Sequence, residues 1–246
     1  MLFALRMLLL SAHFLFASVI GLLIGLIRPF EPDNSRLCAR LYSWGGRIIL
    51  GLEIRAEVEA LKQRRTPCVY VANHQSNYDL FVLGTVVPYR TVSIGKDSLK
   101  FVPFFGQLYW LAGNVLIKRG HATQAKQAML ASTDALQNKD TSIWVFAEGT
   151  RNGGNNMLPF KKGAFQMAIA AGVPIIPVCV SSYPKHMSLN ALKAGLIKIR
   201  ALAEIPTHGL TMEDIPRLMQ QCFEQMQATI RQLDQDIANA RKAVHA

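Results

Sequence analysis

The sequence predicts an α/β fold, in which a mixed, mostly parallel β-sheet is flanked by helices and preceded by a hydrophobic helix or helical hairpin. Three observations predict it. The chain has a long apolar stretch near its N-terminus, and short β-branched runs alternate with helix-like segments through the remainder. Charged or polar residues directly follow several of those runs, as in sheets whose functional groups gather at strand ends. A chain of 246 residues is also long enough to bury a large core.

The apolar N-terminal stretch covers Leu8–Ile27 and has His13 as its one titratable residue. As a helix, about twenty residues span roughly 30 Å, the thickness of a bilayer's hydrocarbon core. The alternative is a secretory signal peptide, but its apolar region is shorter, about 7–15 residues, and ends in a small-residue cleavage site. Because this run continues into Arg28 and further arginines, we expect a retained membrane anchor over residues 1–30.

A second apolar segment, Leu41–Leu52, follows the anchor. It is a candidate partner for the anchor, because Gly21 and Gly25 have the small-x-x-x-small spacing that lets helices approach closely. The N-terminus therefore either spans the bilayer or forms a helical hairpin, extending to about residue 52, that lies in one leaflet. The arginines after the anchor predict, by the positive-inside tendency, that the rest of the chain lies on the cytoplasmic face of the cell inner membrane.

The remainder, residues 60–246, is predicted to be one α/β domain without internal repeats. Its expected strands are 67–72, 91–94, 115–118, 141–146, 175–180 and 195–202, and its expected helices are 80–87, 122–137, 164–171 and a long C-terminal helix over 212–241. Boundary signals support these limits. Pro88 ends one helix, Gly172 suits the position after another, and Thr211–Asp214 resembles a capping box that opens the last.

Composition narrows the class of protein. Half of the residues are hydrophobic and the net charge is +11, a combination that fits an anionic membrane surface or a phosphate-bearing substrate better than nucleic acid. No zinc finger, aromatic RNA-binding motif or helix-turn-helix pattern is present. The four cysteines are scattered without a C-x-x-C spacing, so the sequence indicates neither a zinc ribbon nor a redox dithiol.

The segment 71–80, VANHQSNYDL, places His74 ahead of Asp79 just after a predicted strand. On a regular helix the two side chains would lie about 140° apart and would not meet. Because a strand-end loop separates them, we expect the loop to fold Asp79 back onto the imidazole. A carboxylate on one ring nitrogen leaves the other nitrogen free to act as a base. The zinc pattern H-E-x-x-H is absent, and taken alone the pair fits a structural or solvated histidine more often than a catalytic one.

Three further blocks place charge, glycine or proline beside predicted strands. They are Gly113–Arg119, Phe146–Arg151 and Val173–Val178. Individually, Arg119 and Arg151 fit surface cations, with Glu148 as an ion-pair partner. Together and in this order, these blocks and the H-x4-D pair resemble the glycerolipid acyltransferase family, from about residue 69 to residue 180. Two other segments, 101–110 and 160–163, look like parts of the bacterial 1-acyl-glycerol-3-phosphate acyltransferases of that family. Ala147 departs from the proline of many members, a change that only relaxes the backbone.

The resemblance implies transfer of a fatty acyl group from acyl-CoA or acyl-acyl-carrier-protein to the sn-2 hydroxyl of lysophosphatidic acid, without a cofactor or metal. His74 would remove the hydroxyl proton and Asp79 would orient it. Because no serine or cysteine lies in a nucleophile-elbow pattern, we expect direct transfer. The residues that the resemblance implies for acceptor binding are Glu148, Gly149, Thr150 and Arg151. Arg151 is preferred for the phosphate, and Arg119 and Lys96 are further candidates. Lys161 either binds the phosphate or covers apolar surface with its stem.

Two alternatives stay open at this point. One is an acyltransferase of the same superfamily that acts on another lysolipid. The other is a non-enzymatic, basic, membrane-binding protein, which explains the anchor and the charge but gives no role to His74, Asp79 or the block 148–151.

Overall fold

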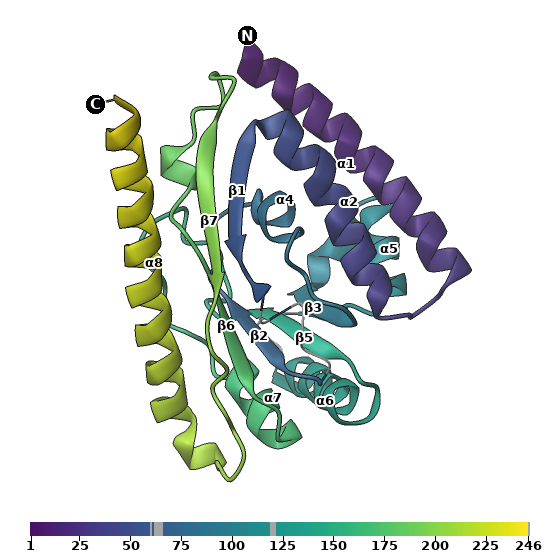
Figure 1. The fold of residues 1–246 in the computed structure, drawn as a ribbon. Coiled ribbons are helices and arrows are strands. Elements are labelled where there is room, and N and C mark those ends of the chain that lie inside the picture. Colours follow the sequence, from purple (N-terminus) through teal and green to yellow (C-terminus); the bar gives the residue numbers. More distant parts are fainter. Residues whose placement is uncertain (60, 62–65, 119–121, 246) are drawn as a thin grey trace.

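A seven-stranded β-sheet forms the centre of the structure, a computed structural model that describes residues 1–59, 61, 66–118 and 122–245 (Figure 1). The strands are β1 (Leu52–Glu57), β2 (Val69–Ala72), β3 (Thr91–Lys96), β4 (Val115–Ile117), β5 (Ser142–Phe146), β6 (Ile175–Val180) and β7 (Gly195–Ala201). Their order across the sheet is β1-β7-β6-β2-β5-β3-β4. Neighbouring strands are parallel except β6 and β7, which are antiparallel. The predicted mixed, mostly parallel sheet is therefore confirmed.

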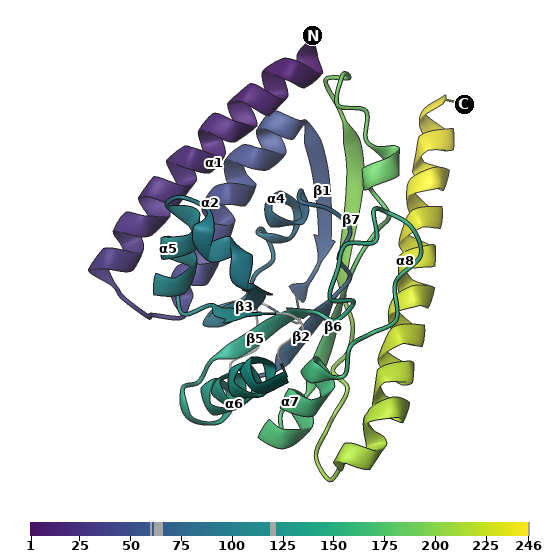
Figure 2. The same ribbon diagram turned by 180° about the vertical axis from the view of Figure 1, so that it is seen from behind.

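Helices cover both faces of this sheet (Figures 1 and 2). They are α1 (Leu2–Ile27), α2 (Asp33–Leu50), α4 (Asp79–Leu83), α5 (Phe105–Leu111), α6 (Ala122–Asn138), α7 (Gly163–Ala171) and α8 (Ile215–His245), with short 3-10 helices η1 (Asp97–Phe101), η2 (Pro184–His186) and η3 (Met212–Asp214). The group α1, α2, α4 and α5 packs on one face, and α6, α7 and α8 pack on the other.

The central strand β2 shows how the sequence produces two cores. Side chains of a strand alternate between the faces of the sheet. Tyr70 and Ala72 accordingly join the cluster beneath α1, α2 and α5, whereas Val69 and Val71 join the cluster beneath α7 and α8. A strand buried on both faces is apolar throughout, which is why this run predicts a strand without an alternating pattern.

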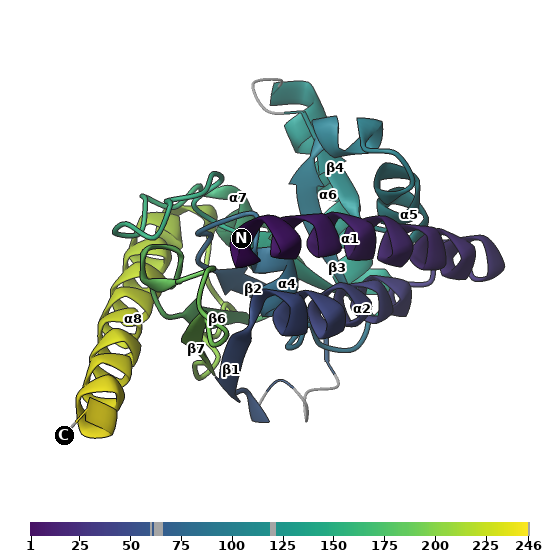
Figure 3. The same ribbon diagram turned by 90° about the horizontal axis from the view of Figure 1, so that it is seen from above.

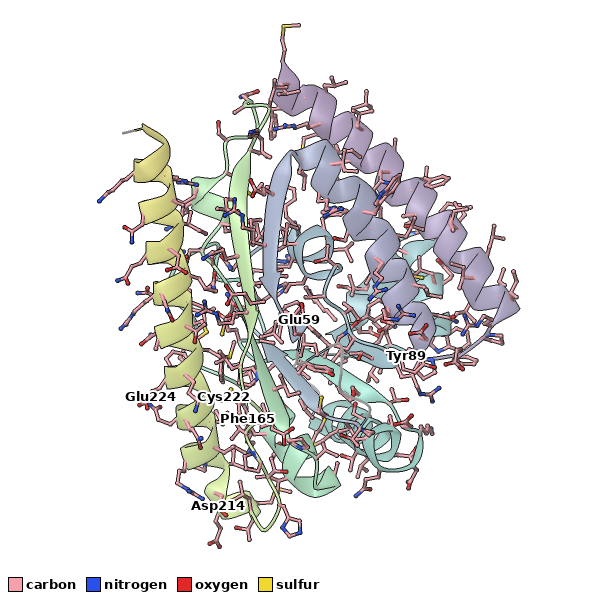
Figure 4. The ribbon with its side chains drawn as sticks, in the orientation of Figure 1. Glu59, Tyr89, Phe165, Asp214, Cys222 and Glu224 are labelled. Carbon is pink, nitrogen blue, oxygen red and sulfur yellow. The ribbon has the colours of Figure 1, made fainter. Side chains whose placement is uncertain are left out.

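The long helix α8 is amphipathic and lies along β6 and β7. Cys222, labelled in Figure 4, is fully buried with Phe165 in the second core, while Glu224 on the same helix is exposed. At its start Thr211 and Asp214 form a reciprocal capping box around η3, so the predicted boundary is confirmed.

The two N-terminal helices form a hairpin that packs on the domain. Figure 3 shows α1 and α2 side by side. A side chain at Gly21 would meet Cys38 of α2 and Leu108 of α5, and one at Gly25 would meet Leu111 of α5. The small-x-x-x-small pair thus brings α1 against α5 as well as α2. Within the described residues α1 is long and apolar enough to cross a membrane.

Strand β1 and helix α5 were not among the predicted elements. Leu52 was predicted to end an apolar segment, whereas residues 52–57 pair with β7 over their whole length. The sheet therefore begins before residue 60. The division into an anchor over 1–30 and a domain over 60–246 stays a prediction.

Candidate active site

The carboxyl ends of three neighbouring parallel strands, β6, β2 and β5, lie together at one edge of the sheet. The loop after β2 carries His74 and leads into α4. The loop after β5 carries the block 147–151, and the loop after β6 carries Tyr183. Because parallel strands all end at the same edge, residues far apart in the sequence meet here.

The predicted contact between His74 and Asp79 is confirmed. The loop turns so that α4 begins at Asp79, and the Nδ1 atom of His74 lies 2.6 Å from Oδ2 of Asp79. Asp79 is 3% exposed. The imidazole also stacks on the ring of Phe146, with the two ring centroids 4.0 Å apart. With Nδ1 bonded to the carboxylate, Nε2 is the nitrogen left to exchange a proton with a substrate.

The carboxylate of Asp79 is held by several donors. Oδ2 also accepts the backbone N–H groups of Gln75 and Ser76, at 2.7 and 3.1 Å. Oδ1 accepts the hydroxyl of Tyr183 at 2.5 Å. This network fixes the position of the carboxylate and, through it, the orientation of the imidazole.

Glu148 is a buried carboxylate that joins the β2 and β5 loops. It is 2% exposed, and its Oε1 accepts the backbone N–H of His74 at 2.7 Å. Its Oε2 accepts the N–H of Leu158 at 2.8 Å and the side-chain amide of Asn152 at 3.0 Å. Its oxygens thus hold the protein's own backbone, whereas a role for Glu148 in shaping the acceptor pocket stays a prediction.

The other residues of this block form a turn whose last side chains are exposed. Gly149 has φ +70°, a conformation that glycine adopts without strain, and the stem of Lys161 lies over it. Thr150 and Arg151 are exposed, and within the described part of the chain the guanidinium of Arg151 has no ion-pair partner. Lys161 is exposed as well, so both cations are accessible to an anionic group.

Of the remaining two predicted phosphate ligands, Lys96 belongs to the next strand of the sheet, β3. Lys96 ends β3, is exposed, and pairs in register with Ile117 of β4. It therefore lies at the same edge as the ends of β2 and β5. Arg119 lies outside the described residues. Among the described residues no group of three or more metal-ligating side chains is placed to hold an ion.

Four residues that the sequence analysis missed stabilise the site. Asn73 exchanges two hydrogen bonds with the backbone of Val180, and Gln75 donates to the carbonyl oxygens of Val180 and Ser181. Asn152 bonds Glu148, and Tyr183 bonds Asp79. The polar run 73–77 was a usable signal for the first two, because buried amides are hydrogen-bonded. Tyr183 had no comparable signal, since it follows the last of the four blocks.

A cavity of about 310 Å³ opens beside this loop, toward α8. Its lining includes Asn73, Gln75 and Asn152 on the loop side and Arg231 and Asp234 on α8, but not His74 or Asp79. The cavity therefore lies beside the loop that carries His74 without including the His74–Asp79 pair.

Comparisons with known proteins show the family of the chain. Residues 54–181 match the acyltransferase family model. The chain is 39% identical to a 1-acyl-sn-glycerol-3-phosphate acyltransferase of Salmonella typhimurium over 85% of this chain and 86% of that protein. It is 36% identical to the Escherichia coli protein of the same name over 99% of both chains. The chain belongs to the acyltransferase family.

The fold is shared with a solved structure. The crystal structure of the 1-acyl-sn-glycerophosphate acyltransferase from Thermotoga maritima matches with a TM-score of 0.71, covering 94% of this chain and 97% of that one. The two sequences are 20% identical, so this likeness concerns the fold alone.

Proposed function

We propose that this protein is a membrane-associated 1-acyl-sn-glycerol-3-phosphate acyltransferase, which transfers a fatty acyl group from acyl-CoA or acyl-acyl-carrier-protein to the sn-2 hydroxyl and so forms phosphatidic acid for phospholipid synthesis. The observation that carries the proposal is the contact of Nδ1 of His74 with Asp79, which leaves Nε2 as the base. The names of the relatives described above support this choice of acceptor over another lysolipid.

In this reaction Nε2 of His74 takes the proton of the sn-2 hydroxyl while its oxygen attacks the thioester carbonyl carbon. The resulting tetrahedral intermediate collapses by breaking its C–S bond, and the thiolate recovers the proton from the imidazolium. Asp79 stabilises the imidazolium throughout. A positioned base of this kind accelerates proton transfer by about 10²–10⁴-fold.

The acceptor's phosphate needs cations at the same edge of the sheet. Arg151 offers two parallel N–H donors to a phosphate, and Lys161 and Lys96 offer point charges nearby in the fold. Their exposure, and the lack of an ion-pair partner for Arg151 among the described residues, support this role.

The apolar hairpin supports attachment in one leaflet. One face of α1 packs on the protein, while Leu8, Phe16 and Ile27 of α1 and Trp44 of α2 are exposed. Both ends of α1 are fastened to the domain. The buried guanidinium of Arg6 donates to the carbonyl oxygens of Leu189 and Leu192, and the N–H of Phe30 donates to Leu111.

A helix held along its length by the domain fits an in-plane position better than an independent crossing of the bilayer. The exposed cations Arg28, Arg40 and Arg47 are suited to anionic headgroups. Because both candidate donors are water-soluble cytoplasmic thioesters, we place the protein on the cytoplasmic face of the cell inner membrane.

The test uses purified protein in mixed micelles with lysophosphatidic acid and each donor in turn. The wild type should form phosphatidic acid, and His74→Ala should lose at least about 10²-fold in kcat with its circular dichroism spectrum unchanged. His208→Ala removes an exposed histidine and should behave as wild type. Substantial turnover by His74→Ala would refute the base assignment. An inactive wild type with intact vesicle binding would favour a non-enzymatic membrane protein, and activity with another lysolipid alone would change the acceptor.

A further inference from the structure

The hydroxyl of Tyr183 reaches the carboxylate of the catalytic pair from a loop outside the four sequence blocks. Tyr183 follows β6, is 1% exposed, and donates to Oδ1 of Asp79 at 2.5 Å. Oδ2 of the same carboxylate already takes three groups, Nδ1 of His74 and two backbone N–H groups. Among the described residues, Tyr183 is therefore the partner that secures the second oxygen.

We propose that Tyr183 is a positioning residue for the catalytic pair, which fixes the rotation of the Asp79 carboxylate and shares its negative charge. The proposal rests on the function proposed above, because it assumes that His74 is the base. Without the phenol, Oδ1 would be a buried acceptor lacking its hydrogen bond, and the contacts of Oδ2 alone would fix the rotation of the carboxylate. The imidazole would keep its contact with Oδ2 but would be held less rigidly.

The loop that carries Tyr183 is itself fixed to the catalytic loop. The side-chain oxygen of Gln75 accepts the N–H of Tyr183 at 3.2 Å, and its amide donates to the carbonyl of Ser181 at 2.9 Å. Gln75 is also one of the residues whose backbone N–H bonds Asp79. Gln75 thus holds the Tyr183 loop through its side chain and the Asp79 carboxylate through its backbone N–H.

The phenol is suited to act as a permanent donor. Burial, reinforced by the negative charge of Asp79, raises the pKa of Tyr183 well above its usual range, so the hydroxyl keeps its proton at physiological pH. The titratable groups around the phenol and the imidazole are Asp79 of α4, Tyr78 beside it, and Glu148 after β5.

Removal of the Tyr183 hydroxyl should shift the pH dependence of the reaction in one direction. An O–H donor draws charge from Oδ1 and weakens the attraction between Asp79 and a protonated imidazole. Without it the protonated form of His74 is favoured, so the neutral base appears only at higher pH. The acidic limb of the pH–rate profile should therefore move to higher pH.

The experiment compares Tyr183→Phe with the wild type and with Tyr42→Phe. Tyr42 is equally buried, and its hydroxyl bonds Ser18 rather than a residue of the site, so this control removes the same buried group outside the network around Asp79. In the micelle assay, Tyr183→Phe should lower kcat by about 10- to 100-fold and change KM for either substrate by less than about twofold. Tyr42→Phe should keep the wild-type kcat and pH profile.

A second measurement needs no substrate and separates this proposal from the proposed function. The rate at which diethyl pyrocarbonate modifies His74, followed by mass spectrometry across pH, reports its neutral form directly. The midpoint should rise in Tyr183→Phe and stay fixed in Tyr42→Phe. An upward shift without any acyl transfer by the wild type would support the positioning role and refute the acyltransferase function. A midpoint that is unchanged or lower in Tyr183→Phe, or a kcat equal to that of Tyr42→Phe, would overturn the positioning role.

Discussion

Replacement of Glu148 by glutamine should destabilise the protein while leaving its shape nearly unchanged. The substitution exchanges one carboxylate oxygen for an NH₂ group of similar size. In one amide orientation this NH₂ faces the N–H of His74, and in the other it faces the N–H of Leu158 and the amide of Asn152. In either orientation the NH₂ group faces a donor whose hydrogen bond the carboxylate accepts. Neither orientation of the amide therefore keeps the hydrogen bonds of both oxygens.

The magnitude follows from these contacts. Hydrogen bonds to a charged group contribute about 1.5–3 kcal/mol each, and an unsatisfied buried donor costs about 1–3 kcal/mol. Glu148→Gln loses at least one such bond and the charge that strengthens the others. We expect a loss of about 2–4 kcal/mol in the free energy of unfolding. At about 2–4 °C per kcal/mol for a domain of this size, Tm should fall by about 4–16 °C.

The assay is thermal and urea unfolding in detergent, followed by tryptophan fluorescence, with Glu224→Gln as the matched control. Glu224 is exposed on α8 and bonds only a neighbouring glutamine among the described residues, so its amide should cost less than about 0.5 kcal/mol. Equal stabilities for the two variants would show that Glu148 does not hold the two loops together. Activity should fall as well, because the backbone of His74 loses its anchor.

Three further outcomes follow from the structure. Arg151→Lys should raise KM for lysophosphatidic acid about tenfold with kcat little changed, because a point charge does not replace a bidentate guanidinium, and an unaltered KM would move the phosphate elsewhere. Trp44→Glu should weaken binding to anionic vesicles about tenfold in flotation assays, because Trp44 is 62% exposed on the apolar face, and undiminished binding would place the membrane contact on another surface. Cys222 should resist iodoacetamide at pH 8 until urea unfolds the protein, because burial raises its pKa to about 12. The stabilisation that comes from keeping the Cys222 thiol protonated is fully present below the usual thiol pKa of 9.0 and is lost as the pH rises toward 12. Labelling of the folded protein at pH 8 would contradict the burial of Cys222.

Most of the sheet could be predicted because its central strands are continuous apolar runs bounded by proline or glycine. Strand β1 could not, since it is an edge strand with mostly exposed residues that directly follows an apolar helix. Its partner β7 lies far along the chain, and such non-local pairing leaves no local signal. Helix α5 did leave one, because Phe105, Leu108 and Tyr109 are buried with helical spacing. These three residues lie within the segment 101–110, which was assigned only by its family resemblance, without a helix.

The candidate site divides in the same way. The contact between His74 and Asp79 could be predicted, because a loop after a strand is the geometry that lets them meet. Their roles as base and orienting group stay predictions. Glu148 was expected at the pocket, but the sequence did not reveal that both of its oxygens hold other loops. The contact of Tyr183 with Asp79 could not be predicted, because it depends on β6 and β2 being neighbours in the sheet.

The fastening of α1 at both ends has a consequence for kinetics. A protein whose apolar face stays in the lipid diffuses in two dimensions, and it meets an acceptor that is confined to the same plane. The concentration that governs its rate is then the mole fraction of acceptor among the surrounding lipids. Inert lipid or detergent added at constant total acceptor should slow the reaction by surface dilution. A membrane-tethered domain that drew its acceptor from solution would show no such effect.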